Sequence, residues 1–198
     1  MLHYRAGTAE LRDGDMLLID AGGEYRNYAA DISRSFPVNG RFTPAQRALY
    51  DIVLDAQHAA IDVARVGQPY SAMHDAAVKV LTEGLIALGL VKGPLRRAIK
   101  DERYKPFYMH KTGHWLGLDV HDVGDYRIDG HWRELEAGMV CTIEPGLYIA
   151  ADAPVAAKWR GIGIRIEDDV LIGKDGPDVL TRALPTAADD IEALVGSA

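Results

Sequence analysis

Apolar residues recur along this chain with two different periods, and the change of period separates strand-like from helix-like stretches. A compact apolar run at 16–20 and a run with β-branched and aromatic residues at 28–36 predict the two strands of a hairpin. Apolar residues at helical spacing follow between residues 44 and 88 and predict two helices. Short extended runs then return, so we expect the second half of the chain to form mainly strands.

The two predicted helices carry signals for their ends. Thr43 and Gln46 form a capping box, and the helix that they start is expected to end near Gly67. Ser71 is expected to cap the second helix, which Gly89 would stop.

The remaining elements are a short helix after Pro94, a sheet and a last helix. Thr186 is expected to cap the last helix, which runs to residue 195. The extended runs read as strands of an antiparallel, half-buried sheet, at residues 107–118, 139–143, 147–149, 161–172 and 179–183. This order predicts an α+β fold in which the helices pack on one side of a curved sheet.

Composition narrows the class of protein. The 198 residues suffice for one domain, and 48% hydrophobic with 26% charged residues exclude a disordered or fibrous chain. The net charge of -7 argues against partners such as nucleic acid or an anionic membrane. No apolar window is long enough for a membrane span, and the single cysteine, Cys141, indicates a reducing compartment. We therefore expect a cytoplasmic protein.

Two aspartates in the predicted hairpin are the first candidates for chemistry. A turn centred between Tyr25 and Arg26 would place Asp20 and Asp31 opposite each other, whereas a turn at Arg26 and Asn27 would make them diagonal neighbours. Both registers keep the two carboxylates on one face. Solvated acids at strand ends are the alternative, and the apolar residues flanking both aspartates weaken it.

Two glutamates, Glu144 and Glu167, lie inside apolar, strand-like runs. Period-two alternation places Arg165 on the same face as Glu167, and Pro145 favours extended geometry at Glu144. The alternative is one buried ion pair between Arg165 and Glu167, with Glu144 uninvolved.

Three histidines, His110, His114 and His121, cluster in one glycine-rich stretch. The spacing of His110 and His114 superficially matches a zinc protease helix, but residue 111 is Lys and the glycines argue against a helix. Cys141 lies within a strand-like run, and we expect it to be an inert buried thiol.

Charge balance joins these candidates into one hypothesis. Four carboxylates in proximity repel one another, by about 4 kcal/mol per close pair at an effective dielectric of 20. Two divalent cations would balance them, and one imidazole with several oxygens suits Mn²⁺, Mg²⁺ or Fe²⁺. Such ions activate water and polarise carbonyl groups, which predicts a hydrolase.

Five segments in this order resemble the catalytic domain of Xaa-Pro aminopeptidases, the aminopeptidase P group of the pita-bread metallopeptidases. The resemblance covers almost the whole chain and is carried by Ile19-Asp20-Ala21-Gly22, residues 30–37, Gly113-His114-Trp115-Leu116-Gly117, Ile143-Glu144-Pro145-Gly146 and Arg165-Ile166-Glu167-Asp168. It implies a single catalytic domain over residues 1–198 with the pita-bread fold, and release of an N-terminal residue from a peptide whose second residue is proline.

The resemblance also implies a set of two metal ions, usually manganese. Asp20 would hold one ion, Asp31 and Glu167 would bridge both, and His114 and Glu144 would complete the second.

Catalytic roles follow from the same resemblance. Glu144 would also shuttle a proton, and His121 would steady the scissile carbonyl and its oxyanion. His110 would lie near the proline side of the substrate. Arg165 would orient a bridging carboxylate.

The resemblance implies that the N-terminal domain and the opening helices and strand of full-length relatives are missing here. Because those elements cover apolar surface, we expect a second copy to cover it, which predicts a homodimer with reduced cleavage. An Xaa-Pro dipeptidase and a metal-binding pseudopeptidase that docks a protein partner are the alternative functions.

Overall fold

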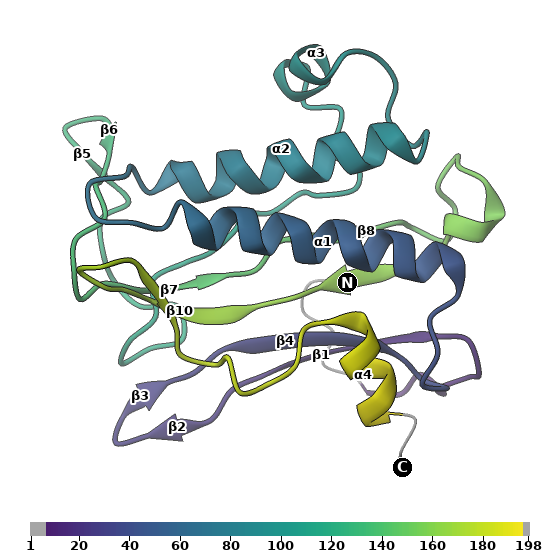
Figure 1. Ribbon diagram of the computed structural model, residues 1–198, viewed down its shortest axis with the longest axis horizontal. Coiled ribbons are helices and arrows are strands. Elements are labelled where there is room, and N and C mark those ends of the chain that lie inside the picture. The colour runs from purple at the N-terminus through teal and green to yellow at the C-terminus, as the bar shows by residue number, and fades with distance from the viewer. Residues whose placement is uncertain (1–6, 196–198) are drawn as a thin grey trace.

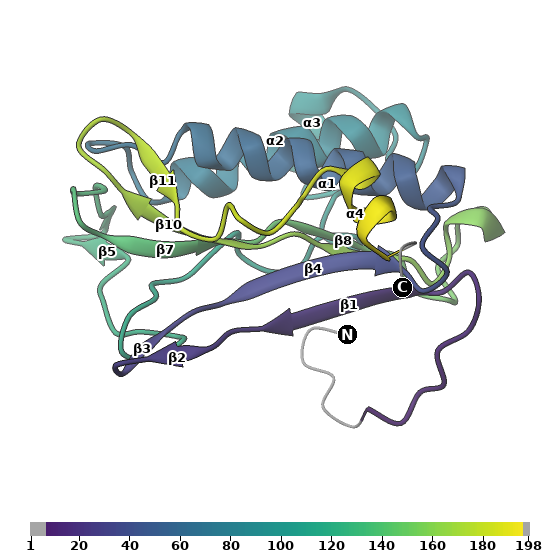
Figure 2. The same ribbon diagram turned by 60° about the horizontal axis from the view of Figure 1, so that its bottom comes forward.

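The computed structural model describes residues 7–195 and contains four α-helices arranged around short antiparallel strands. In Figures 1 and 2, α1 (Pro44–Asp62) and α2 (Ser71–Ala87) lie side by side on one side of β7 (Val140–Ile143) and β10 (Asp168–Ile172), and β1 (Met16–Ala21) and β4 (Ile32–Pro37) lie on the other side. The start of the chain, where opening elements were expected to be missing, lies outside the described residues. In chain order the elements are β1 (Met16–Ala21), β2 (Glu24–Tyr25), β3 (Tyr28–Ala29), β4 (Ile32–Pro37), α1 (Pro44–Asp62), α2 (Ser71–Ala87), α3 (Leu95–Lys100), β5 (Arg127–Ile128), β6 (His131–Trp132), β7 (Val140–Ile143), β8 (Gly146–Tyr148), the 3₁₀ turn Ala157–Trp159, β9 (Gly163–Arg165), β10 (Asp168–Ile172), β11 (Pro177–Val179) and α4 (Ala188–Val195).

The predicted hairpin forms, and the second of its two registers is the observed one. Its tip pairs Tyr25 with Tyr28, so the turn consists of Arg26 and Asn27. Both turn residues have positive φ, 52° and 70°, as a type I′ hairpin turn requires. Asp20 pairs with Ser33 in the β1–β4 ladder, which makes Asp20 and Asp31 diagonal neighbours on one face.

Helix ends agree only partly with the sequence signals. The capping box of Thr43 and Gln46 starts α1, but α1 ends at Asp62 rather than near Gly67. Helix α2 begins at Ser71, so Ser71 is its first residue and Tyr70 is an N-cap without a side-chain hydrogen bond. The predicted cap of α4 is also wrong, because that helix begins at Ala188, beyond Thr186.

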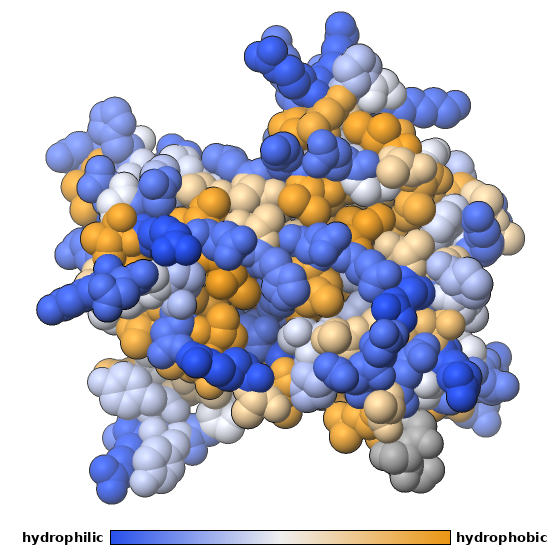
Figure 3. All heavy atoms as spheres, in the orientation of Figure 1, coloured by the Kyte–Doolittle hydropathy of each residue, from blue (hydrophilic) through white to orange (hydrophobic). Residues whose placement is uncertain are grey.

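The core lies between the two long helices and the strands. Its fully buried side chains come from both layers and include Leu49, Val53, Leu81, Leu85, Ile143, Ile164, Ile166 and Ile172. Figure 3 shows one face of the molecule, on which hydrophilic and hydrophobic residues are mixed over the two long helices. No helix within residues 7–195 is long and apolar enough to cross a membrane.

The predicted strand over residues 107–118 is absent, although residues 112–116 lie against β7. Thr142 N–H donates to the His114 carbonyl oxygen at 2.9 Å, as in a ladder, but His114 N–H donates to the Thr142 side chain at 3.1 Å. This exchange of a backbone acceptor for a side-chain acceptor breaks the regular pattern. The close approach requires Gly113, where a Cβ would lie 2.0 Å from the Thr142 carbonyl oxygen.

Three other predicted strands are shorter or divided. The run 28–36 is split around Asp31, and the run 161–172 is split at Glu167, which forms an isolated bridge with Ser33. Of the predicted run 179–183, only Val179 lies in a strand, at the end of β11 (Pro177–Val179), because the chain turns from residue 180 onward. Two of these interruptions therefore fall at candidate ligand residues.

Candidate metal centre

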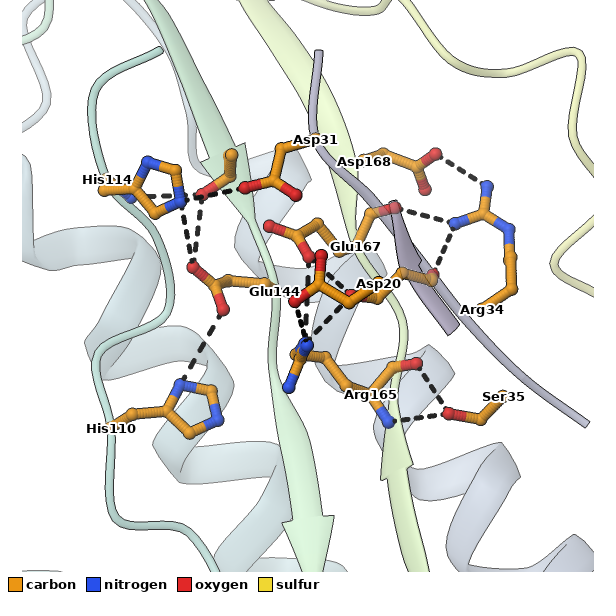
Figure 4. A network of polar contacts seen from close by, with 12 residues as sticks. Asp20, Asp31, Arg34, Ser35, His110, His114, Glu144, Arg165, Glu167 and Asp168 are labelled. Carbon is orange, nitrogen blue, oxygen red and sulfur yellow. Dashed lines mark hydrogen bonds and ion pairs between the residues drawn. The ribbon is translucent and has the colours of Figure 1, made fainter. Parts of the chain in front are cut away.

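A cavity of about 940 Å³ lies where the strand ends and the glycine-rich segment meet. Its wall includes every residue that the sequence singled out for chemistry: Asp20, Asp31, His110, His114, His121, Glu144, Arg165 and Glu167. The fold thus brings together side chains from segments far apart in the sequence. Figure 4 shows the carboxyl groups of Asp20, Asp31, Glu144 and Glu167 gathered between His114 and Arg165.

His114 lies between two of these acids. Its Nε2 is 3.3 Å from Asp31 Oδ2 and 3.5 Å from Glu144 Oε1. Its Nδ1 lies 3.0 Å from the Trp115 carbonyl oxygen, which can only accept a hydrogen bond. In the neutral ring this contact places the hydrogen on Nδ1 and leaves the Nε2 lone pair directed at the acids.

Asp31, His114 and Glu167 form the tightest group of donor atoms. One ligand atom from each lies within 4.8 Å of the others, and Asp31 and Glu167 are buried. Ser33 Oγ donates to Glu167 at 2.6 Å and so fixes one carboxylate oxygen.

Arg165 supplies the nearest positive charge. Its guanidinium donates to Asp20 and to Ser33 Oγ, and its Nε lies 3.7 Å from Glu167. The predicted shared face of Arg165 and Glu167 is thus observed. Arg165 also donates to the Tyr148 hydroxyl at 3.2 Å.

The two glutamates hold their protons unusually strongly. Burial, reinforced by the charges of Glu144 and Asp31, raises the pKa of Glu167 to about 9. Burial likewise raises the pKa of Glu144 to about 7, although His114 and Arg165 oppose the shift. The cluster therefore carries more carboxylate groups than its own cations can neutralise.

The aspartates and His114 respond differently. Burial opposes ionisation of Asp31, but hydrogen bonds with His114 and Asp20 outweigh it and lower the pKa of Asp31. Burial raises the pKa of Asp20 despite the opposing charge of Arg165. Burial opposes the charged form of His114, but the hydrogen bonds to Asp31 and to the Trp115 carbonyl, together with the charges of Glu144 and Asp31, outweigh it and raise the pKa of His114.

The other two histidines flank this cluster. His121 packs edge-on against His114, with ring centroids 4.4 Å apart. His110 Nδ1 lies 2.7 Å from the Lys111 carbonyl oxygen, and its Nε2 lies 2.9 Å from the Tyr148 hydroxyl. Burial lowers the pKa of His110 to about 4, so this ring is neutral at neutral pH. Neither histidine is on a helix, and Cys141 is fully buried, as predicted.

Two supporting residues were not predicted from the sequence. Asp169 accepts the Asp31 N–H with both carboxylate oxygens, at 3.2 and 3.3 Å, and Ser33 holds Glu167. Period-two alternation could have indicated both supporting residues. Ser33 follows Asp31 by two positions and Asp169 follows Glu167 by two, so each shares a strand face with a candidate ligand.

Comparison with known proteins decides the family. Residues 1–174 match the description of metallopeptidase family M24. The chain belongs to metallopeptidase family M24. An Xaa-Pro aminopeptidase of Escherichia coli K12 is 50% identical over 198 residues, which are 100% of this chain and 45% of that protein.

Solved structures of aminopeptidases agree with this assignment. Aminopeptidase PepP from Pseudomonas aeruginosa has a TM-score of 0.98 and 54% identity, over 99% of this chain and 45% of that one. Proline aminopeptidase P II from Yersinia pestis has a TM-score of 0.96 and 52% identity, over 100% of this chain and 45% of that one. The predicted α+β, pita-bread fold class is confirmed. This M24 chain spans about 45% of the length of these relatives.

The donor set of this M24 chain fits divalent metal. Four carboxyl groups and one imidazole suit hard or borderline cations, whereas Cys141, the only thiol, is buried elsewhere. Burial is the main cause of the raised pKa values of Glu144 and Glu167, and the charges of neighbouring carboxylates add to it. A divalent ion would supply opposing positive charge.

Proposed function

We propose that this chain forms a metal-dependent aminopeptidase centre that releases the N-terminal residue from peptides with proline at the second position. The observation that carries the proposal is the convergence of four acids and His114 on one cavity wall. The names of the relatives supply the substrate class, because they are Xaa-Pro aminopeptidases.

We propose two divalent ions, most simply Mn²⁺, held by the five residues of this cluster. Asp20 would hold one ion, Asp31 and Glu167 would bridge both, and His114 and Glu144 would complete the second. Such a pair of ions supplies water activation and carbonyl polarisation when bound. The charge count supports a second ion, since four carboxylates carry one more negative charge than Arg165 and one divalent ion together balance.

Glu144 is proposed as the group that moves a proton. Its carboxylate lies beside His114 and is the acid of this cluster that follows β7 directly. It would take a proton from the attacking water and return it to the leaving amine nitrogen. The Thr142 hydroxyl, which donates to Glu144 Oε1 at 3.3 Å, keeps this carboxylate in place.

The two flanking histidines are proposed to bind the substrate. His121 would donate a hydrogen bond to the scissile carbonyl oxygen as negative charge develops on it. His110 would contact the proline side. Arg165 would act through Glu167 and Asp20 by fixing the direction of their carboxylates.

The experiment that tests this proposal compares three substrates in the presence of Mn²⁺: an Xaa-Pro-Xaa tripeptide, an Xaa-Pro dipeptide and a tripeptide without proline. Cleavage of the first with release of its N-terminal residue is the expected result. Cleavage of the dipeptide alone would favour the dipeptidase. Metal binding without cleavage of any peptide would favour the pseudopeptidase. Glu144→Gln is the matched control and should abolish turnover.

We further propose that residues 1–198 act as one catalytic domain that works as a homodimer in the cytoplasm. Of the described strands, only β4 pairs with β1, and Ile19 on β1 is 46% exposed. An exposed apolar edge strand is a surface that a second copy can cover. Sedimentation at micromolar concentration should give the dimer mass, and a monomer would contradict this assembly.

A further inference from the structure

A buried chain of hydrogen bonds leads from the core to the cavity on the side of α2. The Tyr108 hydroxyl lies 2.7 Å from Thr112 Oγ1, and His74 Nδ1 lies 2.9 Å from the same oxygen. Tyr108 and Thr112 are almost completely buried, with 1% and 2% exposure. None of these three residues belongs to the proposed metal centre.

Counting the hydrogens in these hydrogen bonds assigns the tautomer of His74. Within residues 7–195 the only hydrogen-bond partner of the Tyr108 hydroxyl is Thr112 Oγ1, so the buried Tyr108 proton must be donated there. The Thr112 hydroxyl then directs its own single proton to His74 Nδ1, the remaining partner. His74 Nδ1 is therefore an acceptor, and the ring hydrogen of neutral His74 is on Nε2.

The reverse arrangement is unfavourable. If His74 Nδ1 carried the hydrogen, Thr112 Oγ1 would accept from it, and either the Tyr108 proton or the Thr112 proton would then lack an acceptor among the described residues. A buried donor without a partner costs about 1–3 kcal/mol. The relay thus acts in one direction, from Tyr108 through Thr112 to His74.

His74 ends this relay at the cavity. It lines the same cavity as the metal centre, together with Lys111 and His110. Thr112, which orients His74, also accepts the Glu144 N–H through its carbonyl oxygen at 2.7 Å. No hydrogen bond from the rest of the described chain reaches His74 Nε2, so its N–H is available to a ligand.

We propose that His74 is a substrate-binding residue whose Nε2–H donates a hydrogen bond to an oxygen of the bound peptide. That oxygen belongs to a carbonyl or to the terminal carboxylate of the part of the peptide that leaves when the bond before proline is cleaved. This inference rests on the proposed function for the identity of the peptide. The leaving part of the peptide is indicated because His74 and His110, the residue proposed to contact proline, both pack against the Tyr108 ring, with centroid distances of 5.8 and 4.8 Å. A neutral N–H donor in a half-buried wall matches a peptide oxygen, which only accepts.

The charge state of His74 agrees with this role. Burial, with smaller contributions from Lys111 and His110, lowers the pKa of His74 to about 4. The ring is therefore neutral at neutral pH, as the relay requires.

Two substitutions distinguish the contributions of the two ring nitrogens of His74. His74→Asn keeps an acceptor near the Nδ1 position but removes the Nε2–H, whereas His74→Gln places an amide N–H near the Nε2 position. For an Xaa-Pro-Xaa tripeptide, His74→Asn should raise KM about fivefold to tenfold, the effect of one lost hydrogen bond. His74→Gln should recover most of this loss, and kcat and Mn²⁺ affinity should stay within twofold in both variants. His58→Asn, at an exposed histidine of α1, is the matched control and should match the parent protein.

A second measurement is independent of turnover. In a ¹H–¹⁵N spectrum of the ring nitrogens of the Mg²⁺-loaded protein, assigned with His74→Asn, His74 should be the Nε2–H tautomer. Titration with the tripeptide should shift its Nε2 resonance. If the parent protein cleaves no Xaa-Pro peptide, the proposed function fails, but the peptide-dependent shift still decides this inference. An Nδ1–H tautomer, an unchanged resonance on peptide addition, or a parental KM in His74→Asn would overturn it.

Discussion

The carboxylate of Asp169 accepts the backbone N–H of Asp31 across the boundary between β4 and β10, with contacts of 3.2 and 3.3 Å. Asp31 lies at the break between β3 and β4, where a regular ladder partner is missing. The side chain of Asp169 replaces that partner and thereby fixes the backbone from which the Asp31 carboxylate projects. A residue outside the proposed ligand set thus positions a proposed bridging ligand.

Replacement of Asp169 should therefore weaken metal binding without removing a ligand. Asp169→Ala leaves the Asp31 N–H without its acceptor, and loss of such supporting contacts typically lowers metal affinity about 10-fold to 100-fold. Calorimetric titration with Mn²⁺ should show this weakening. Asp175→Ala, at an exposed acid, is the control. Equal Mn²⁺ affinity in the two variants would show that Asp169 has no positioning role.

The buried ion pair of Arg34 and Asp168 should contribute strongly to stability. Arg34 donates to Asp168 at 2.7 Å and to the Glu167 carbonyl oxygen at 2.7 Å, and both side chains are largely buried. Arg34→Ala leaves the Asp168 charge uncompensated, which should lower the free energy of unfolding by about 3–5 kcal/mol. Urea denaturation measures this loss, with Arg96→Ala at an exposed site as the control. A change below about 1 kcal/mol would contradict the assignment.

Without metal, the protein should lose stability as the pH rises. The pKa values of Glu144 and Glu167 are raised from 4.5 to about 7 and about 9, so the folded state retains protons that the unfolded state has released. The free energy of unfolding must then fall between about pH 4.5 and pH 9. Urea denaturation in chelator at pH 6 and pH 8 tests the sign. Glu167→Gln should flatten the dependence above pH 7, and a parent protein that is more stable at pH 8 would refute this explanation.

Metal should reverse this loss at neutral pH. Free Mn²⁺ at one hundred times its dissociation constant should add about 2.7 kcal/mol to the free energy of unfolding, provided that the unfolded chain does not bind it. The melting temperature measured with Mn²⁺ should therefore exceed that measured with chelator. Identical melting temperatures would argue against a native metal site.

Local signals predicted the parts of the fold that depend on neighbouring residues. Asn27 tolerates positive φ, and the turn at Arg26 and Asn27 sets the diagonal register of Asp20 and Asp31. The capping box at Thr43 likewise marks the start of α1 correctly. In both cases the deciding contacts lie within a few residues.

Contacts between distant segments could not be predicted in the same way. The segment before β7 reads as a strand, but the Thr142 side chain takes a hydrogen bond that a regular ladder would give to the backbone. The relay from Tyr108 to His74 also depends on how α2 packs against that segment. Apolar periodicity contains no information on such pairings.

The central claim is that this acidic cluster binds two metal ions, and metal stoichiometry tests it most directly. After Mn²⁺ loading and removal of free metal, elemental analysis of the parent protein should give close to two ions per chain. Asp31→Ala, which removes a proposed bridge, should lose the paired site and bind fewer ions. Two tightly bound ions in Asp31→Ala, or none in the parent protein, would contradict the account.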